Sequence, residues 1–236
     1  MRTNDIEYTA AGRRLVGQLV VDDTVEGRRP GVLVAHDFLG LRAHTKDIAA
    51  RLAGLGFVAF AVDYHGDGAV LADDEVGARF GELAADVDQV RALATAALDV
   101  LRGSEHVDPD RIAAIGYCFG GTFVLELARS GADVRAVVGF HSGLGTPRPA
   151  DARNITAKVL VCIGADDPII PPDQRAEFEA EMRDGGVDWQ MHLYGGVGHS
   201  FTNPDADGAQ NPALKYDRRA DEQSWAALVD HFDRFL

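Results

Sequence analysis

The segment Gly116-Tyr117-Cys118-Phe119-Gly120-Gly121 has the spacing of a nucleophile elbow, Gly-x-nucleophile-x-Gly, with cysteine in place of serine. A sharp strand-to-helix turn strains the nucleophile, and glycines two residues away on each side make room for it. This turn would lift the Cys118 thiol above a sheet edge and aim the Phe119 N–H and the positive end of the next helix at the reaction centre. The alternative is a buried structural cysteine beside a glycine turn. The spacing favours the nucleophile.

A cysteine nucleophile needs a base, and the base needs a group that orients it. In folds with this elbow, the chain order is nucleophile, acid, histidine. Asp167 follows one apolar run in the segment GADDP, and His199 follows another in the segment GHSF. We therefore predict a triad of Cys118, Asp167 and His199, with Asp166 as the competing acid. The alternatives are a turn-capping aspartate and a surface-loop histidine.

An oxyanion hole on this fold takes a second N–H from the loop after the first central strand. That loop is AHDFLG, residues 35–40. We predict that the Phe38 N–H works with the Phe119 N–H. Asp37 in the same loop is interpreted in two ways, as a second base for the thiol or as a cap before the next helix.

The elements that must position these residues alternate along the chain. Short, nearly continuous apolar runs indicate strands buried on both faces, and amphipathic stretches between them indicate covering helices. A Gly turn between the first two runs indicates an antiparallel hairpin. The predicted strands are 6–10, 14–21, 31–36, 57–62, 111–116, 134–140, 158–164 and 189–194. The predicted helices are 45–54 with Thr45 as N-cap, 82–102, 120–130, 172–184 and 215–236.

This order predicts one doubly wound α/β domain over residues 1–236, with a mostly parallel eight-stranded sheet and helices on both faces. The segment 141–157, where a helical lid would be inserted, is short, so we predict no lid domain. An uncovered site suits small, soluble esters or lactones better than long lipids.

Composition narrows the class of protein. The chain has 236 residues, of which 46% are hydrophobic and 25% charged, and its formal net charge is −14. This charge argues against nucleic-acid and anionic-membrane partners, and no apolar run approaches the ~18 residues of a membrane span. The first residues lack a signal-peptide pattern, and Cys118 and Cys162 are too few for a disulfide scaffold. We expect a cytoplasmic protein, monomeric or weakly homodimeric, with Cys162 packed in a strand.

Together, the segments AHDFLGL, GYCFGG, GADDPIIPP and YGGVGHSF resemble the dienelactone hydrolase family of the α/β-hydrolase superfamily, from about residue 14 to the end. The resemblance implies an α/β-hydrolase fold and a Cys-His-Asp triad that hydrolyses a cyclic enol ester without a cofactor. Cys118, Asp167 and His199 match the family's nucleophile, acid and base. The family places a glutamate, implicated in switching on the thiol, where this chain has the shorter Asp37.

Two positions depart from the family pattern. Members that act on dienelactone resemble one another in holding the substrate carboxylate with two arginines. One of these positions, four residues after the histidine, is Asn203 here, and Arg79 is the only candidate for the other. Asparagine cannot replace a bidentate arginine. We therefore expect neutral small esters to be better substrates than anionic lactones.

Other polar residues near the predicted sheet edge carry weaker signals. Tyr64 and His65 follow the strand 57–62, and we expect them either to line the pocket or to form an ordinary turn. His36 and the aspartates beside these residues match no established metal-ligand spacing, so we expect no metal. The family resemblance likewise implies that no cofactor is used.

The sequence therefore predicts hydrolysis of a small carboxylic ester or lactone through a cysteine thioester, with the small molecule as the partner. The alternatives are a non-catalytic small-ligand-binding protein on the same fold and a thiol redox sensor at Cys118.

Overall fold

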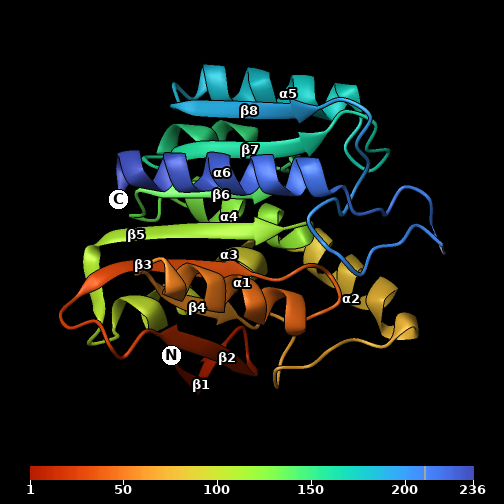
Figure 1. Cartoon of the computed structure of the whole chain (residues 1–236). Coiled ribbons are helices and arrows are strands. Elements are labelled where there is room, and N and C mark those ends of the chain that lie inside the picture. The colour runs from red at the N-terminus through yellow and green to blue at the C-terminus, as the bar shows by residue number, and fades with distance from the viewer. Residues whose placement is uncertain (210) are drawn as a thin grey trace.

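An eight-stranded sheet organises the computed structural model, which describes residues 1–209 and 211–236 (Figure 1). The strand order is β1-β2-β4-β3-β5-β6-β7-β8. β1 pairs antiparallel with β2 and β2 with β4, while the other neighbours are parallel. The strands are β1 (Arg2–Ala10), β2 (Arg13–Val21), β3 (Arg29–Ala35), β4 (Val58–Val62), β5 (Val107–Tyr117), β6 (Ala136–Phe140), β7 (Lys158–Gly164) and β8 (Trp189–Tyr194). The prediction of a mostly parallel eight-stranded sheet is confirmed.

Helices cover both faces of this sheet, as predicted. α1 and α6 lie on the face turned towards the viewer in Figure 1, and they bury apolar residues against the sheet. α3, α4 and α5 pack on the opposite face in a second apolar cluster. The central strands are buried on both faces, which explains their continuous apolar runs. The helices are α1 (Ala43–Gly54), α2 (Asp73–Ala85), α3 (Val87–Arg102), α4 (Phe119–Arg129), α5 (Pro172–Asp184) and α6 (Arg218–Phe235).

Two helix predictions are wrong in detail. The segment predicted as one helix, 82–102, belongs to α2 and α3, which are separated at Asp86. The Asp86 side chain accepts the Gln89 N–H at 3.0 Å, so it caps a new helix instead of continuing the old one. Thr45 is not an N-cap, because α1 begins two residues earlier, after the extended Arg42, and Thr45 is buried inside the helix.

The loops at the carboxyl ends of the parallel strands gather at one edge of the sheet, where α2 also lies (Figure 1). Between β6 and β7 the chain forms only the short 3₁₀ helix η1 (Pro149–Asn154), with no lid domain in residues 141–157, all of which are described. None of the described helices is long and apolar enough to cross a membrane.

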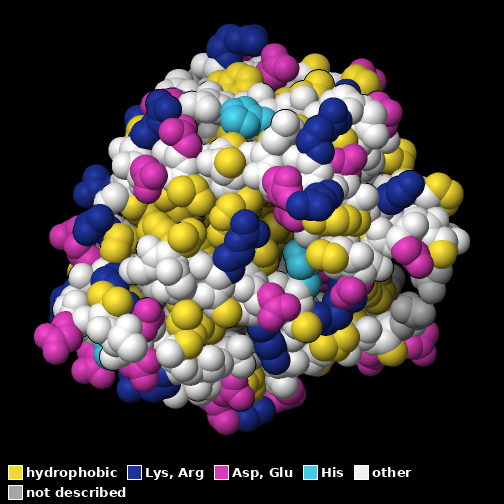
Figure 2. Space-filling view, in the orientation of Figure 1, with side chains coloured by type: hydrophobic (Ala, Val, Ile, Leu, Met, Phe, Trp, Pro, Cys, Tyr) yellow, Lys and Arg dark blue, Asp and Glu magenta, His cyan; other side chains and the backbone are white. Residues whose placement is uncertain are grey.

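The face of the molecule that carries α1 and α6 is solvated by charges of both signs. Figure 2 shows Asp and Glu side chains interspersed with Lys and Arg over this face, with hydrophobic side chains gathered in patches between them. Several of these charges pair along α6, as in the Arg218–Glu222 and Arg234–Asp230 ion pairs. Exposed pairs of this kind contribute little to stability, so the fold depends on the two apolar clusters.

Candidate active site

The elbow has the strained geometry that its sequence predicts. Cys118 joins β5 to α4 with φ 54° and ψ −120°, in a region that non-glycine residues rarely adopt. Its N–H donates to the Phe140 carbonyl at 3.0 Å. A Cβ on Gly116 would lie 2.0 Å from the Gly120 carbonyl oxygen, and a Cβ on Gly120 would lie 2.3 Å from the His36 carbonyl oxygen. Both glycines are therefore required by close backbone approach.

A buried carboxylate orients the histidine. The Nδ1 of His199 lies 2.7 Å from Oδ2 of Asp167, and both residues are at most 3% exposed. The other carboxylate oxygen of Asp167 accepts the Ile169 N–H at 2.8 Å, which fixes the carboxylate plane. Asp166 is exposed and does not face the imidazole in this way. The geometry thus favours Asp167 over Asp166 as the orienting acid.

The charge state of His199 depends on its two neighbours. Burial lowers the pKa of His199, but the hydrogen bond to Asp167 and the adjacent Cys118 thiol outweigh burial and raise this pKa to about 10. No hydrogen bond joins Nε2 to Cys118 or to any other partner among the described residues. The site can therefore hold a protonated imidazole beside the sulfur, with the Nε2 proton available to a substrate.

The two residues predicted to form the oxyanion hole line the cavity beside Cys118. Phe38 and Phe119 line the same cavity as Cys118, and their rings meet edge to face with centroids 5.4 Å apart. Among the described hydrogen bonds, neither the Phe38 N–H nor the Phe119 N–H donates to a protein acceptor. Both are thus available to an oxygen bound above Cys118.

Asp37 is engaged by its own loop and by the next helix. Its Oδ1 accepts the Leu39 N–H at 2.9 Å, and its Oδ2 forms an ion pair with Arg42 at 2.6 Å. Arg42 was not among the predicted site residues, although a basic residue five positions after Asp37 is close enough in the chain to suggest an ion pair. The carboxylate that was considered as a second base is therefore paired with a cation.

The cavity above Cys118 has two arms, which meet at Cys118 and His199. The apolar arm has a volume of about 650 Å³. The polar arm has a volume of about 560 Å³. The apolar arm is lined mainly by Phe38, Val76, Phe80, Leu83, Val87, Val90, Phe119, Ile169 and Ile170, with Glu126 at its wall. The polar arm is lined by residues that include Asp37, Arg42, Asn203, Asp205 and Asp207. The lining residues from α2 were not among the predicted site residues. The apolar spacing of Val76, Phe80 and Leu83 was the signal that could have indicated them.

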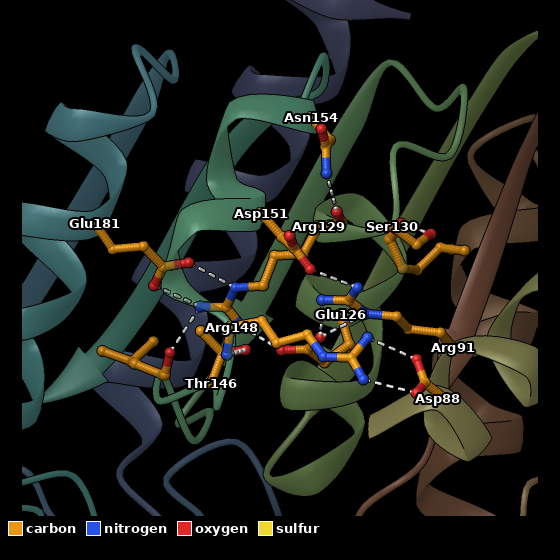
Figure 3. Close-up of polar contacts among 12 residues, drawn as sticks. Asp88, Arg91, Glu126, Arg129, Ser130, Thr146, Arg148, Asp151, Asn154 and Glu181 are labelled. Atoms are coloured by element: carbon orange, nitrogen blue, oxygen red, sulfur yellow. Dashed lines mark hydrogen bonds and ion pairs between the residues drawn. The ribbon is translucent and has the colours of Figure 1, made fainter. Parts of the chain in front are cut away.

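The one carboxylate in the wall of the apolar arm is neutralised by arginines. Figure 3 shows Glu126 between Arg91 and Arg129, with nitrogen–oxygen distances of 2.8 and 3.0 Å. Arg129 is fully buried and also pairs with Glu181 at 2.7 Å, and Arg91 pairs with Asp151 at 2.7 Å. Each of these three carboxylates is paired with an arginine and both arginines are engaged, so the cluster offers no unpaired arginine to a ligand in the arm.

Three residues that the sequence placed at the pocket lie behind its wall. Arg79 is 7% exposed, donates to the Tyr64 carbonyl and forms an ion pair with Glu82 at 2.8 Å. Tyr64 and His65 are buried and line neither arm, so of the two alternatives the structure favours the turn over the pocket. The reason is that the loop after β4 turns inward, beneath the loop that carries Phe38. Asn203, in contrast, lines the polar arm as expected.

The chain is similar to several known proteins. The model of the dienelactone hydrolase family matches residues 16–236. A solved structure named m3DLH is 44% identical, with a TM-score of 0.96 over 100% of this chain and 98% of that one. A dienelactone hydrolase-like promiscuous phosphotriesterase from metagenomic libraries is 39% identical, with a TM-score of 0.95 over 99% and 98% of the two chains. A probable 2-oxo-3-(5-oxofuran-2-ylidene)propanoate lactonase of Bradyrhizobium is 32% identical over 75% of each chain.

These matches agree with the architecture. The family model covers the elbow, the acid and the histidine in one continuous alignment. The TM-scores show that the fold is shared with both solved structures over nearly the whole chain. The chain belongs to the dienelactone hydrolase family of α/β hydrolases.

Proposed function

We propose that this protein hydrolyses small, uncharged carboxylic esters or lactones through a thioester on Cys118. One observation carries the proposal. The imidazole of His199 is held at Nδ1 by a buried carboxylate and has no partner at Nε2, and it lies beside a cysteine in a strained elbow. A group oriented in this way is what a thiol nucleophile requires of its base.

In the proposed reaction, the Cys118 sulfur attacks the ester carbonyl carbon, and the carbonyl oxygen becomes an oxyanion between the Phe38 and Phe119 N–H groups. As the carbon–oxygen bond breaks, the His199 imidazolium gives its Nε2 proton to the leaving alkoxide. Water then attacks the thioester, with His199 accepting one of its protons. The carbon–sulfur bond breaks, the carboxylic acid leaves, and the thiolate–imidazolium pair is restored. Each donor in such an oxyanion hole typically contributes about 10² to 10³ in rate.

The charges around the cavity support an uncharged substrate. Arg79, the expected carboxylate ligand, is engaged with Glu82 behind the wall. Arg42, which lines the polar arm, is paired with Asp37. Asn203 lies among exposed aspartates in the same arm. A substrate carboxylate would thus meet no unpaired arginine among the described lining residues.

The test is Cys118→Ala, compared with Cys162→Ala as a matched control. We expect turnover of a neutral aryl ester to fall by about 10³ or more in the Cys118 variant, because the nucleophile is removed. The control removes a thiol that is buried in β7 and contacts Tyr194, and it should keep its activity. Intact-protein mass spectrometry should detect an acyl adduct in the unmodified protein and none in Cys118→Ala.

Retention of more than about a tenth of the activity in Cys118→Ala would contradict the proposal. Ligand binding without turnover in the unmodified protein would favour the binding-protein alternative. Rapid peroxide oxidation of Cys118 without turnover would favour the redox-sensor alternative.

A second candidate activity is hydrolysis of uncharged phosphotriesters. It is favoured by the mainly apolar lining of this arm, whose one carboxylate is paired with arginines, together with the similarity to a promiscuous phosphotriesterase. The sulfur would attack phosphorus and displace an aryl oxide, and water would then release the phosphodiester. An aryl dialkyl phosphate assayed with the same two cysteine variants tests this activity, and no turnover by the unmodified protein rules it out.

A further inference from the structure

The two carbonyl groups on either side of the Phe38 N–H are held by buried side chains. The single O–H of Tyr64 is shared between two carbonyl oxygens, that of His36 at 2.8 Å and that of Asp37 at 3.0 Å. The Asp37 carbonyl also accepts a hydrogen bond from His36 Nδ1. The Phe38 carbonyl accepts one from His65 Nε2, at 2.9 Å. His36 and Tyr64 are fully buried and His65 nearly so, and none of the three lines either arm of the cavity.

Because the peptide is trans, the hydrogen bonds to the Asp37 carbonyl also determine where the Phe38 N–H points. The described residues contain no cis peptide bond, and in a trans peptide the C=O and N–H groups point in opposite directions. Because the Asp37 carbonyl is drawn inward to Tyr64 and His36, the Phe38 N–H must point outward, towards the cavity that Phe38 lines. The orientation of the Phe38 N–H, the proposed oxyanion donor, is thus set by buried side chains that lie outside the cavity.

The two histidines can act as fixed donors because they are neutral. Burial lowers the pKa of His36 to about 3, and burial also lowers the pKa of His65. A neutral imidazole has a single N–H, and only a donor can bond to a carbonyl oxygen. The proton is therefore on Nδ1 of His36 and on Nε2 of His65. The opposite nitrogens have no partner, as expected of bare lone pairs.

Tyr64 is itself held in place on several sides. Its ring stacks on His36 with centroids 3.7 Å apart and on Phe123 with centroids 4.9 Å apart. Its own carbonyl accepts a hydrogen bond from Arg79. The preceding residue, Asp63, is fully buried, and its carboxylate accepts four backbone N–H groups that fix the loop after β4. The Tyr64 hydroxyl therefore has little freedom to move away from the carbonyls it binds.

We propose that Tyr64, His36 and His65 form a peptide clamp, a set of positioning residues that orients the Phe38 N–H for oxyanion binding. The inference rests on the proposed function, because it needs an oxyanion to form above Cys118. The clamp residues touch neither substrate nor sulfur, and they act only through the Phe38 peptide. This arrangement also gives Arg79 a role in this chain, which is to hold the loop that carries Tyr64.

The first experiment is Tyr64→Phe, with Tyr8→Phe as a matched control. Tyr64→Phe keeps the stacked ring and removes the hydroxyl, so we expect kcat for a neutral aryl ester to fall about 10- to 100-fold with little change in KM. Tyr8→Phe also removes a tyrosine hydroxyl from a backbone carbonyl, that of Asp63 at 2.6 Å, but none of the described hydrogen bonds joins the Tyr8 side chain to residues 35–40. Its kcat should change by less than about twofold.

A second readout separates donor positioning from a general loss of structure. Iodoacetamide alkylates Cys118 by displacing iodide at a saturated carbon, so no oxyanion forms at the reacting centre. Its rate in Tyr64→Phe should stay within about twofold of the unmodified protein. A small aldehyde that forms a thiohemiacetal on Cys118 does place an oxygen in the hole, and its affinity should fall in parallel with kcat. Unchanged ester turnover, or alkylation that falls as far as ester turnover, would overturn the clamp.

His65 supplies an independent pair of variants should Tyr64→Phe fail to fold. The amide nitrogen of glutamine can donate from nearly the place of Nε2, so His65→Gln should keep kcat within about threefold, whereas His65→Leu should lose activity as Tyr64→Phe does. Equal activity of the two variants would refute the role of the N–H donor. An unmodified protein that neither turns over esters nor forms an acyl adduct would overturn the proposed function and the clamp with it. Turnover that is indifferent to all these variants would overturn the clamp alone.

Discussion

The histidines on the two sides of Phe38 and Cys118 are buried to a similar degree, but His199 is protonated and His36 is neutral. His199 contacts a carboxylate and a thiol, and these neighbours outweigh burial and raise its pKa to about 10. His36 bonds to a backbone carbonyl and faces His65, so burial and the second imidazole lower its pKa to about 3. The comparison shows that burial alone lowers the pKa of a histidine, which leaves it neutral and able only to donate and accept hydrogen bonds in a fixed orientation. Burial beside an ionised group makes it a carrier of a proton.

A third histidine supports this comparison. His141 lies behind His199, with ring centroids 4.8 Å apart, and donates or accepts at Nε2 only with the Thr202 hydroxyl. It has no carboxylate partner, and burial together with the neighbouring His199 lowers its pKa well below the usual value. The Asp167 carboxylate, rather than a position at this edge of the sheet, therefore gives His199 a higher pKa than His141 and His36.

Asp167→Asn should break the comparison with the largest effect. Without the carboxylate, His199 becomes a buried histidine like His36, and asparagine can hold it in the wrong tautomer. We expect kcat for a neutral ester to fall by about 10³ to 10⁴. Asp166→Asn is the matched control, since Asp166 is exposed, and should change kcat by less than about threefold. A larger loss in the Asp166 variant would show that the acid is misassigned by one position.

Asn203→Arg should have an intermediate effect. It tests whether the polar arm of the cavity binds a substrate carboxylate poorly because it lacks an unpaired arginine. We compare kcat/KM for a carboxylated lactone and its methyl ester. A charge-assisted contact contributes about 1.5 to 3 kcal/mol, so the arginine should raise kcat/KM for the carboxylated member by about tenfold or more and leave the methyl ester unchanged. A preference for the anion of about tenfold in the unmodified protein would contradict this interpretation of Asn203.

The smallest expected effect is on the pH dependence of stability. The contribution of His199 to stability falls as pH rises, whereas that of His36 falls as pH decreases. The folded pKa of His199 exceeds its usual value of 6.5, so His199 stabilises the fold below pH 6.5 and loses this contribution as pH rises towards about 10. The folded pKa of His36 is depressed, so its contribution is present above pH 6.5 and is lost as pH falls towards about 3.

Thermal melting of two variants measures these slopes. The Tm difference between the unmodified protein and Asp167→Asn should shrink as pH rises above 6.5. His36→Asn keeps a donor near Nδ1, and its Tm relative to the unmodified protein should rise as pH falls below 6.5. Parallel Tm curves for a variant and the unmodified protein across either range would show that the corresponding histidine does not titrate as described.

The order of strands and helices could be predicted because the central strands are buried on both faces and therefore read as apolar runs. The break at Asp86 could not, because the apolar spacing in α2 continues in phase into α3 across it. Only the competition between the Asp86 side chain and the next turn of helix for the Gln89 N–H ends α2. Thr45 shows the same limit, since its burial against the sheet overrides its preference for a cap.

The triad candidates could be proposed from sequence because elbow, acid and base each follow a strand, and parallel strands bring such loops to one edge. The clamp could not, because its chemistry depends on which way the Asp37–Phe38 peptide turns, and no residue pattern encodes that rotation. Arg79 is the clearest case. Its position suggested a ligand for substrate, but the nearby Glu82 and the Tyr64 carbonyl engage it behind the wall.

The capped break at Asp86 has a consequence for how this scaffold can change over generations. The proposed reacting groups are anchored to strand ends, whereas much of the apolar arm is supplied by α2. This helix packs against α3 and ends at Asp86, whose side chain caps α3. Substitutions at the lining positions Val76, Phe80 and Ala84, which leave Arg79 in place, can thus change what fits above the sulfur while the proposed reacting groups are retained. For laboratory evolution, these positions of α2 are therefore the ones to vary when a change of substrate selectivity is sought.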